Sequence, residues 1–114
     1  MNATNTIAAT GEDLDILART IFGEARGESL VGQIAVAFCI LHRAQIALAW
    51  RAAHGDRAHP LYGNGSITSA CRAPWQFSCW NINDPTRARM VAVTMDDKAF
   101  QTASLVAHEV LKGS

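Results

Sequence analysis

Apolar residues recur at intervals of three and four along much of the chain, the spacing of one face of an α-helix. A first helix is expected over 11–26, with Thr10 as its N-cap and Asp13 completing a capping box. Gly27 suits the end of this helix, and Gly23 lies opposite the apolar stripe, where another segment could approach closely. The stripe consists of Leu14, Leu17, Ala18, Ile21, Phe22 and Ala25.

A second, alanine-rich helix follows, capped by Ser29 and expected to run to about Ala52. Its length and apolar composition predict the central core helix. Cys39, within its apolar run, is expected to be a buried thiol. The expected inner face comprises Val31, Ile34, Ala35, Phe38, Leu41, His42, Gln45 and Ala49.

The next part of the chain is less regular. Glycine, proline and asparagine over 53–69 indicate a loop, and the Trp, Phe and Cys residues over 70–83 are consistent with short strands. Asp84 and Pro85 form a favourable N-cap and first-turn pair for a short helix to about Thr94.

A last helix is expected to start at Asp96 or Asp97 and to end near Gly113. The whole pattern predicts a mostly α (α+β) fold with a small irregular or β-hairpin insertion. It divides the chain into a flexible tail over 1–9 and one domain over 10–114. The inward positions of the last helix are Phe100, Ala103, Val106, Ala107, Val110 and Leu111.

Composition narrows the function classes. Hydrophobic residues make up 49% of the 114 residues, enough for a real core in one small domain. The formal net charge is zero, which argues against nucleic acid as the main partner, since phosphate binding favours a basic surplus. No run of 18 apolar residues and no secretory signal occur, so neither membrane insertion nor a leader is expected.

Two carboxylates are candidates for chemistry. Glu24 falls at the flank of the apolar stripe, where partial desolvation would raise its pKa and keep it protonated as a general acid requires. The alternative is a surface glutamate paired with Arg26 or Arg51. Glu28 is expected to support the site, either as a partner of Glu24 or by accepting N–H groups at the start of the second helix.

Aromatic and amide residues cluster in CRAPWQFSCWN, which spans 71–81. Aromatic faces stack on sugar rings, and amides bond hydroxyl and N-acetyl groups, so this segment is a candidate glycan-binding groove. Phe77 is also a candidate core residue. The candidate binding residues are Trp75, Gln76, Phe77, Trp80 and Asn81.

The remaining reactive side chains offer less. Cys71 and Cys79 bracket the aromatic segment and either form a disulfide across a short loop or remain two free thiols. His54 and His59 lie five apart in a loop, and a zinc site would need a third ligand such as His108. No HExxH pair, GxSxG elbow or phosphate-binding loop is present, so no metal or cofactor is expected.

The chain carries the motifs TIFGEARGES followed by GQ and AVA, then ILHR, then PWQFSCWN and DP. Through these motifs it resembles the cell wall hydrolase family typified by spore cortex-lytic enzymes, in its phage and prophage form. The likeness covers residues 14 to about 112. It implies a lysozyme-like, lytic-transglycosylase-type fold with peptidoglycan as substrate.

By this resemblance Glu24 matches the family's catalytic glutamate, Glu28 belongs to its EARGE signature, and Gln76 with Phe77 matches its groove segment. Two departures stand out. The family usually has Asn where this chain has His42, and it continues past its last helix into a segment that helps to close the site. An open cleft beside Glu24 is therefore expected.

The resemblance predicts a glycosidase that cleaves the bond between N-acetylmuramic acid and N-acetylglucosamine. We expect it to act on the cell wall as a monomer. Since no secretory signal is present, it would reach the wall after release by another agent such as a lysing phage. A lytic transglycosylase route forms 1,6-anhydro ends and needs one carboxylate, whereas paired-acid glycosidases need two. Hydrolysis by water, an N-acetylmuramoyl-L-alanine amidase and a non-catalytic peptidoglycan-binding module are the alternatives.

Overall fold

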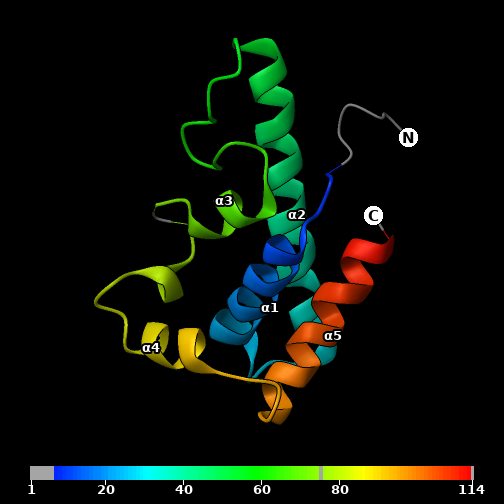
Figure 1. Cartoon of the computed structure of the whole chain (residues 1–114), viewed down its shortest axis with the longest axis vertical. Helices are drawn as coiled ribbons and strands as arrows, with labels where there is room; N and C mark the ends of the chain where they lie inside the picture. The colour runs from blue at the N-terminus through cyan, green and yellow to red at the C-terminus, as the bar shows by residue number, and fades with distance from the viewer. Residues whose placement is uncertain (1–6, 75, 114) are drawn as a thin grey trace.

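The computed structural model describes residues 7–74 and 76–113, and this part of the chain is entirely α-helical apart from turns (Figure 1). The described residues form no strand, and a single isolated β-bridge joins His59 to Gly63. The expected β-hairpin is therefore wrong. The elements in order are α1 (Gly11–Ala25), α2 (Leu30–Ala53), α3 (Ile67–Arg72), the short 3₁₀ helix η2 (Ser78–Trp80), α4 (Pro85–Ala92) and α5 (Lys98–Gly113).

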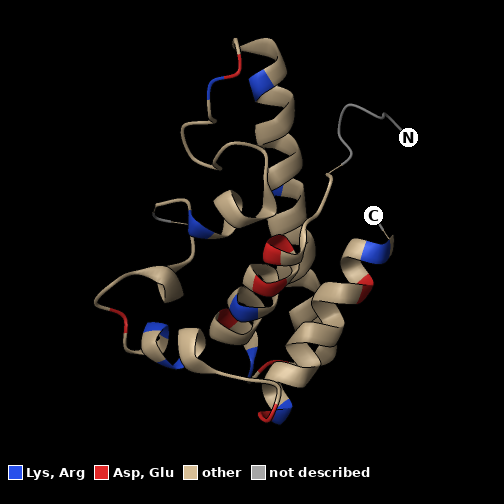
Figure 2. Ribbon diagram, in the orientation of Figure 1, with Lys and Arg blue, Asp and Glu red and all other residues tan. Residues whose placement is uncertain are grey.

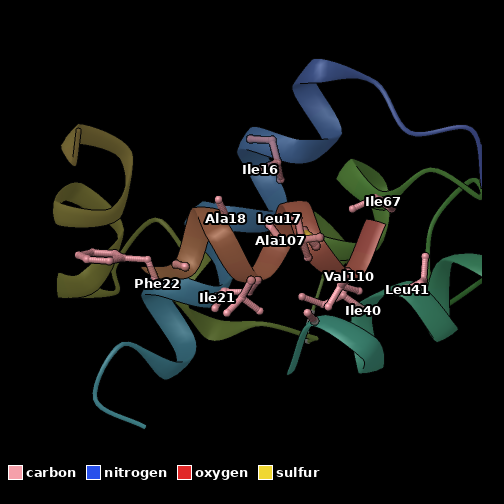
Figure 3. Packing of buried hydrophobic residues seen from close by; sticks show 14 of the residues in the cluster. Ile16, Leu17, Ala18, Ile21, Phe22, Ile40, Leu41, Ile67, Ala107 and Val110 are labelled. Atoms are coloured by element: carbon pink, nitrogen blue, oxygen red, sulfur yellow. The ribbon is translucent and has the colours of Figure 1, made fainter. Parts of the chain in front are cut away.

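Helix α1 is the centre of the fold. It packs against α5 along much of its length and also contacts α2, α3, α4 and η2. Figure 1 shows α2 running past this centre, with the 54–66 loop folded back over its far end. The apolar side chains of α1, α2, α3 and α5 meet in one core (Figure 3). Its largest fully buried members include Leu17, Ile21, Phe22, Ile40, Ile67 and Met90.

The helix starts follow the capping residues that the sequence offers. The Gly32 N–H donates to the Ser29 hydroxyl over 3.2 Å, and the Thr86 N–H donates to the Asp84 carboxylate over 2.8 Å. The Phe100 N–H donates to Asp97 over 3.1 Å, so Asp97 caps α5. The three predicted starts are confirmed, because each side chain satisfies an N–H group that has no partner within its helix.

The capping box of α1 also joins two helices. The Thr10 N–H donates to Asp13 Oδ2 (3.0 Å) while the Asp13 N–H donates to Thr10 Oγ1 (3.1 Å). Asp13 Oδ1 accepts from both the N–H and the hydroxyl of Thr68, at 2.9 and 2.7 Å. Asp13 is buried, and burial alone would raise its pKa, but these hydrogen bonds outweigh burial and lower the pKa below its ordinary value.

Helix α2 faces the core with a different side from the one expected. Val31 and Phe38 are 76% and 53% exposed, and Cys39 is exposed rather than buried. Apolar residues surround most of α2, so periodicity alone did not define its inner face; the other helices pack on the side where small alanines allow close approach. The buried residues of α2 are Gln33, Ala37, Ile40, Leu41, Ala44 and Ala47.

By length and mean hydropathy alone, α2 is also the one helix among the described residues that could cross a membrane. A core helix passes the same test, and α2 contacts α1, α3 and α5.

The segment between α2 and α4 was expected to be a loop with strands, and it contains α3 and η2 instead. Ser66 starts α3 by accepting from the Ser69 N–H over 3.1 Å, and Asp13 takes the Thr68 N–H. Six residues form a helix here because both a local cap and a distant carboxylate satisfy its first N–H groups.

Replacing Asp13 by asparagine tests the joint between α1 and α3. An amide would point N–H donors at the donors of Thr10 or Thr68, so we expect Asp13→Asn to lower the free energy of unfolding by about 1–3 kcal/mol at pH 7. Because the pKa of Asp13 is lower in the folded state, its charge stabilises the fold above the unfolded pKa of ~3.9 and this contribution is lost as pH falls through the folded pKa.

Thermal unfolding from pH 7 to pH 2.5 measures both effects. The difference between wild type and variant should shrink below about pH 4. Glu12→Gln, an exposed neighbour in the same first turn, is the control and should change little. Equal losses in the two variants would contradict the role of Asp13.

Candidate functional site

The two motifs singled out in the sequence meet in space. The indole N–H of Trp80 donates to the Thr20 hydroxyl over 2.9 Å, and the backbone N–H of Cys79 donates to Glu24 Oε1 over 3.3 Å. Gly23 lies directly under Cys79 between these two contacts. The C-terminal half of α1 therefore contacts η2 through Thr20, Gly23 and Glu24, which lie on one face of the helix.

Gly23 is what permits this approach. A Cβ atom built on Gly23 would lie 2.9 Å from Cys79 Cβ and 2.8 Å from Met90 Sδ, both closer than real Cβ atoms come to other heavy atoms. Glycine is thus required at this position of α1 by packing from η2 and α4. The predicted close approach opposite the apolar stripe is confirmed.

Glu24 lies in the last turn of α1 and is exposed. The partial burial inferred from the helical wheel is wrong, because the apolar face of α1 turns to α2 and α5 and leaves Glu24 at the edge; its exposure agrees instead with the open cleft that the resemblance implied. The backbone N–H of Cys79 donates to it, and the Cys79 thiol is hydrogen-bonded to the same side chain. The carboxylate is therefore held by Cys79 on one side and open to solvent on the other, where it could meet a large ligand.

The thiol of Cys79 responds to this neighbour. Burial, a hydrogen bond to the Glu24 side chain and the charge of Glu24 together raise the pKa of Cys79. Burial raises the pKa of Cys71 to about 12. Neither thiol is therefore a nucleophile near neutral pH.

Glu28 is placed differently from the expectation. Helix α1 ends at Ala25, so Glu28 lies in the turn beyond it and is exposed. The Ser29 hydroxyl, not the Glu28 carboxylate, accepts the N–H at the start of α2. The buried side chain of Gln33 donates to the Glu28 carbonyl over 3.3 Å, which fixes the turn that follows the EARGE motif.

The aromatic segment divides into supporting and exposed residues. Trp80 is half-buried, with its N–H bound to Thr20 and the Arg72 guanidinium 4.9 Å from its ring centroid. Phe77 packs partly against the core, as the alternative interpretation expected, with the Arg43 guanidinium 5.0 Å from its ring centroid. These two rings hold the segment in place more than they offer a free face to a sugar.

The polar members of the segment remain available. Gln76 is half-buried and Asn81 is exposed. Trp75 lies outside the described residues. Asn81 is therefore the most exposed of the described candidate binding residues, while Gln76 is as partly buried as the rings of Phe77 and Trp80.

A hollow of about 370 Å³ adjoins η2 and is lined by Pro74, Asn81, Ile82 and Asn83. Two amides beside two exposed apolar side chains suit the alternating polar and apolar faces of a saccharide. Ile82 and Asn83 were not identified from the sequence, although the run NIND follows the aromatic motif directly and alternates amide with apolar residues.

His54 and His59 have structural roles. The ring of His54 stacks on Trp50 with 3.6 Å between centroids, and His59 Nδ1 accepts the backbone N–H groups of Leu61 and Tyr62 at 3.0 and 3.2 Å. Within residues 7–74 and 76–113, no three His, Cys, Asp or Glu side chains converge as a metal site would require.

The three cysteines are free in the structure, which matches the free-thiol alternative and not the bridge between Cys71 and Cys79. Both of these thiols are buried beside the α1 core, so packing rather than a covalent staple holds η2.

Comparisons with known proteins give two matches. The model of a family described as a domain of unknown function (DUF7742) matches residues 10–97. A spore cortex-lytic enzyme of Halalkalibacterium halodurans is 50% identical over 42 residues, which cover 36% of this chain and 13% of that protein. The chain thus matches only a small part of that relative's length. No solved structure matches the chain.

Gly23→Ala tests the close approach. Alanine favours helices over glycine by about 1 kcal/mol, but the overlap with Cys79 should outweigh this gain and lower stability by ~1–3 kcal/mol. Gly27→Ala is the matched control, since a Cβ there would meet nothing within 4 Å. Thermal melts of both variants measure the effect, and equal melting temperatures would show that η2 gives way freely.

Thiol counting tests the free cysteines. With Ellman's reagent at pH 8, native protein should expose one fast thiol, Cys39, and unfolded unreduced protein should show three. One thiol after unfolding would instead establish the bridge between Cys71 and Cys79.

Proposed function

This chain belongs to the family described as a domain of unknown function (DUF7742), and we propose that it is a cell wall hydrolase that cleaves the glycan strands of peptidoglycan. The observation that carries the proposal is the meeting of Glu24 with η2 through the Cys79 amide. It joins the EARGE and QFSCW motifs, which resemble those of cell wall hydrolases, into one surface. The partial identity to a spore cortex-lytic enzyme supports the same substrate class.

Glu24 is the acid in this proposal. Cys79 orients the carboxyl group, and the exposure of this group allows it to present a proton to a bound glycan. Asp84 is engaged as the cap of α4, where it accepts the Thr86 N–H, and Glu28 lies outside α1, in the turn that follows it. A mechanism with a single carboxylate therefore suits the site.

The route of a lytic transglycosylase needs one such group. Glu24 gives its proton to the oxygen between N-acetylmuramic acid and N-acetylglucosamine, and that glycosidic bond breaks. The acetamido oxygen of the muramic acid stabilises the cation at C1. Glu24, now ionised, takes the proton of the 6-hydroxyl as that oxygen bonds to C1, which closes the 1,6-anhydro ring and restores the acid.

The amide-lined hollow suits the substrate side of this proposal. Asn81 and Asn83 offer both donors and acceptors to hydroxyl and N-acetyl groups, and Ile82 offers an apolar face. A lysozyme-like arrangement, with a glutamate at the end of a core helix facing a glycan groove, is the architecture that the resemblance implies.

A non-catalytic peptidoglycan-binding module is the second candidate, and the exposure of Glu24 is the observation that favours it. An acid in water lacks the dry surroundings in which enzymes strengthen electrostatic catalysis. Binding without bond cleavage would then be the whole function of the same surface.

Glu24→Gln separates these functions. The amide keeps the shape and its contact with Cys79 but has no proton to give, so solubilisation of purified sacculi in EDTA should fall by ~10²–10⁴-fold. Sedimentation with sacculi should be unchanged. Glu28→Gln, four residues on and also exposed, is the control and should keep its activity.

Two results would count against the enzyme. Lysis by Glu24→Gln at the wild-type rate would remove Glu24 as the acid. Wild-type protein that sediments with sacculi but never solubilises them would establish the binding module instead.

A further inference from the structure

The side of α2 that the core leaves uncovered carries large apolar side chains near the start and the centre of the helix. Phe38 is 53% exposed at its centre and Val31 is 76% exposed near its start. Leu105 of α5 is exposed across a groove of about 300 Å³ between the two helices. We call the α5 side of this groove the α5 rim. Among the described residues, five exposed large apolar side chains lie on α2 or on the α5 rim: Leu30, Val31, Phe38, Ile46 and Leu105.

The spacing on this side is that of a helix-pairing seam. Its residues alternate intervals of four and three, as the a and d positions of a coiled coil do. Phe38 and His42 stand at the middle of the seam. We call these residues the α2 seam: Val31, Ala35, Phe38, His42, Gln45 and Ala49.

The α2 seam carries no fixed charge. Helix α2 has no Asp or Glu, and its two arginines are used elsewhere. Arg43 lies against the rings of Phe77 and Tyr62, and Arg51 donates to the Asn64 carbonyl over 2.9 Å. A helix face that only met water would carry charged side chains, so this face is built to meet another apolar surface.

We propose that the α2 seam pairs with the same seam of a second copy, with the two α2 helices antiparallel. The seam is symmetric about residue 40, so a two-fold axis there sets Phe38 of one copy against the partner's His42 and Val31 against the partner's Ala49. A neutral chain brings no net repulsion to such a pair, and the interface is isologous, the commonest kind in small homodimers.

The available area sets the strength of the dimer. A helix of 24 residues is ~36 Å long and ~10 Å across, so the seam offers roughly 400 Å² per copy, before the α5 rim is added. The pair would bury on the order of 1,000 Å², at the low end of specific interfaces. An interface of this size suits a weak dimer, which we expect to form at micromolar concentrations in place of the monomer expected from the sequence. The seam shares no residue with the Glu24 site.

Sedimentation velocity from 1 to 200 µM tests the pairing. Wild type should move from monomer to dimer across this range, while Val31→Glu should weaken association at least ~100-fold, because each copy would bury an unpaired carboxylate against the partner's Ala49. Phe38→Glu is a second seam variant and should also weaken association, because each copy would lose a buried ring and desolvate a carboxylate. Leu61→Glu is the matched control, since Leu61 is 52% exposed on the 54–66 loop and lies off the seam. Circular dichroism confirms that each variant is folded.

Cross-linking places the contact. Cys39 borders the seam and is the one exposed cysteine of the described residues, so a short bis-maleimide should join two copies through it, and neither Cys39→Ser nor Phe38→Glu should be joined.

Wild type that remains monomeric at 200 µM would overturn the proposal, as would an equal loss of dimer in Leu61→Glu. Sedimentation of the monomer with liposomes, abolished by Phe38→Glu, would overturn it in favour of a membrane surface.

Discussion

The close contact between Gly23 of α1 and Cys79 of η2 is the constraint on which the candidate site depends. With no side chain at Gly23, the η2 backbone comes near enough for the Cys79 N–H to reach Glu24. The same approach lets Trp80 reach the buried Thr20 hydroxyl. Any larger residue at Gly23 would push η2 outward and separate the glutamate from the groove segment. The absence of a side chain at Gly23 therefore allows the EARGE and QFSCW motifs to contact each other.

A second joint on α1 supports the first. Asp13 ties the start of α1 to the start of α3, while Gly23 and Glu24 tie its end to η2. The chain from Thr68 to Cys79 is thus tied to α1 at both of its ends, and the residues that line the hollow lie within this stretch or directly after it. Figure 2 shows that charged residues are spread over α1 and α4 but are sparse along α2. In the two proposals, the polar side would meet a glycan and the uncovered side of α2 would meet a second copy.

Local chemistry explains which features the sequence predicted. The starts of α1, α2 and α4 follow from their N-cap residues, which are Thr10, Ser29 and Asp84. The side chains of these residues satisfy nearby backbone N–H groups, and this capping can be recognised in the sequence. Helix α3 was missed because one of its first N–H groups is satisfied by Asp13, which is distant in sequence.

The inner face of α2 could not be predicted for a related reason. Apolar residues surround this helix, so the choice of face depends on which neighbours pack there, and periodicity does not record that choice. At the site, the pairing of Glu24 with the aromatic segment followed from the motifs. The exposure of Glu24 agrees with the open cleft that the resemblance implied and not with the partial burial inferred from the helical wheel, because it depends on how η2 and α4 border the end of α1.

The central claim is that Glu24 donates a proton to a glycosidic oxygen of peptidoglycan. Mass spectrometry of the fragments released from purified sacculi in EDTA tests it most directly. The account predicts muropeptides that end in 1,6-anhydro-N-acetylmuramic acid, formed by wild type and absent with Glu24→Gln. Free stem peptides released from intact glycan strands, or no fragments at all, would contradict it.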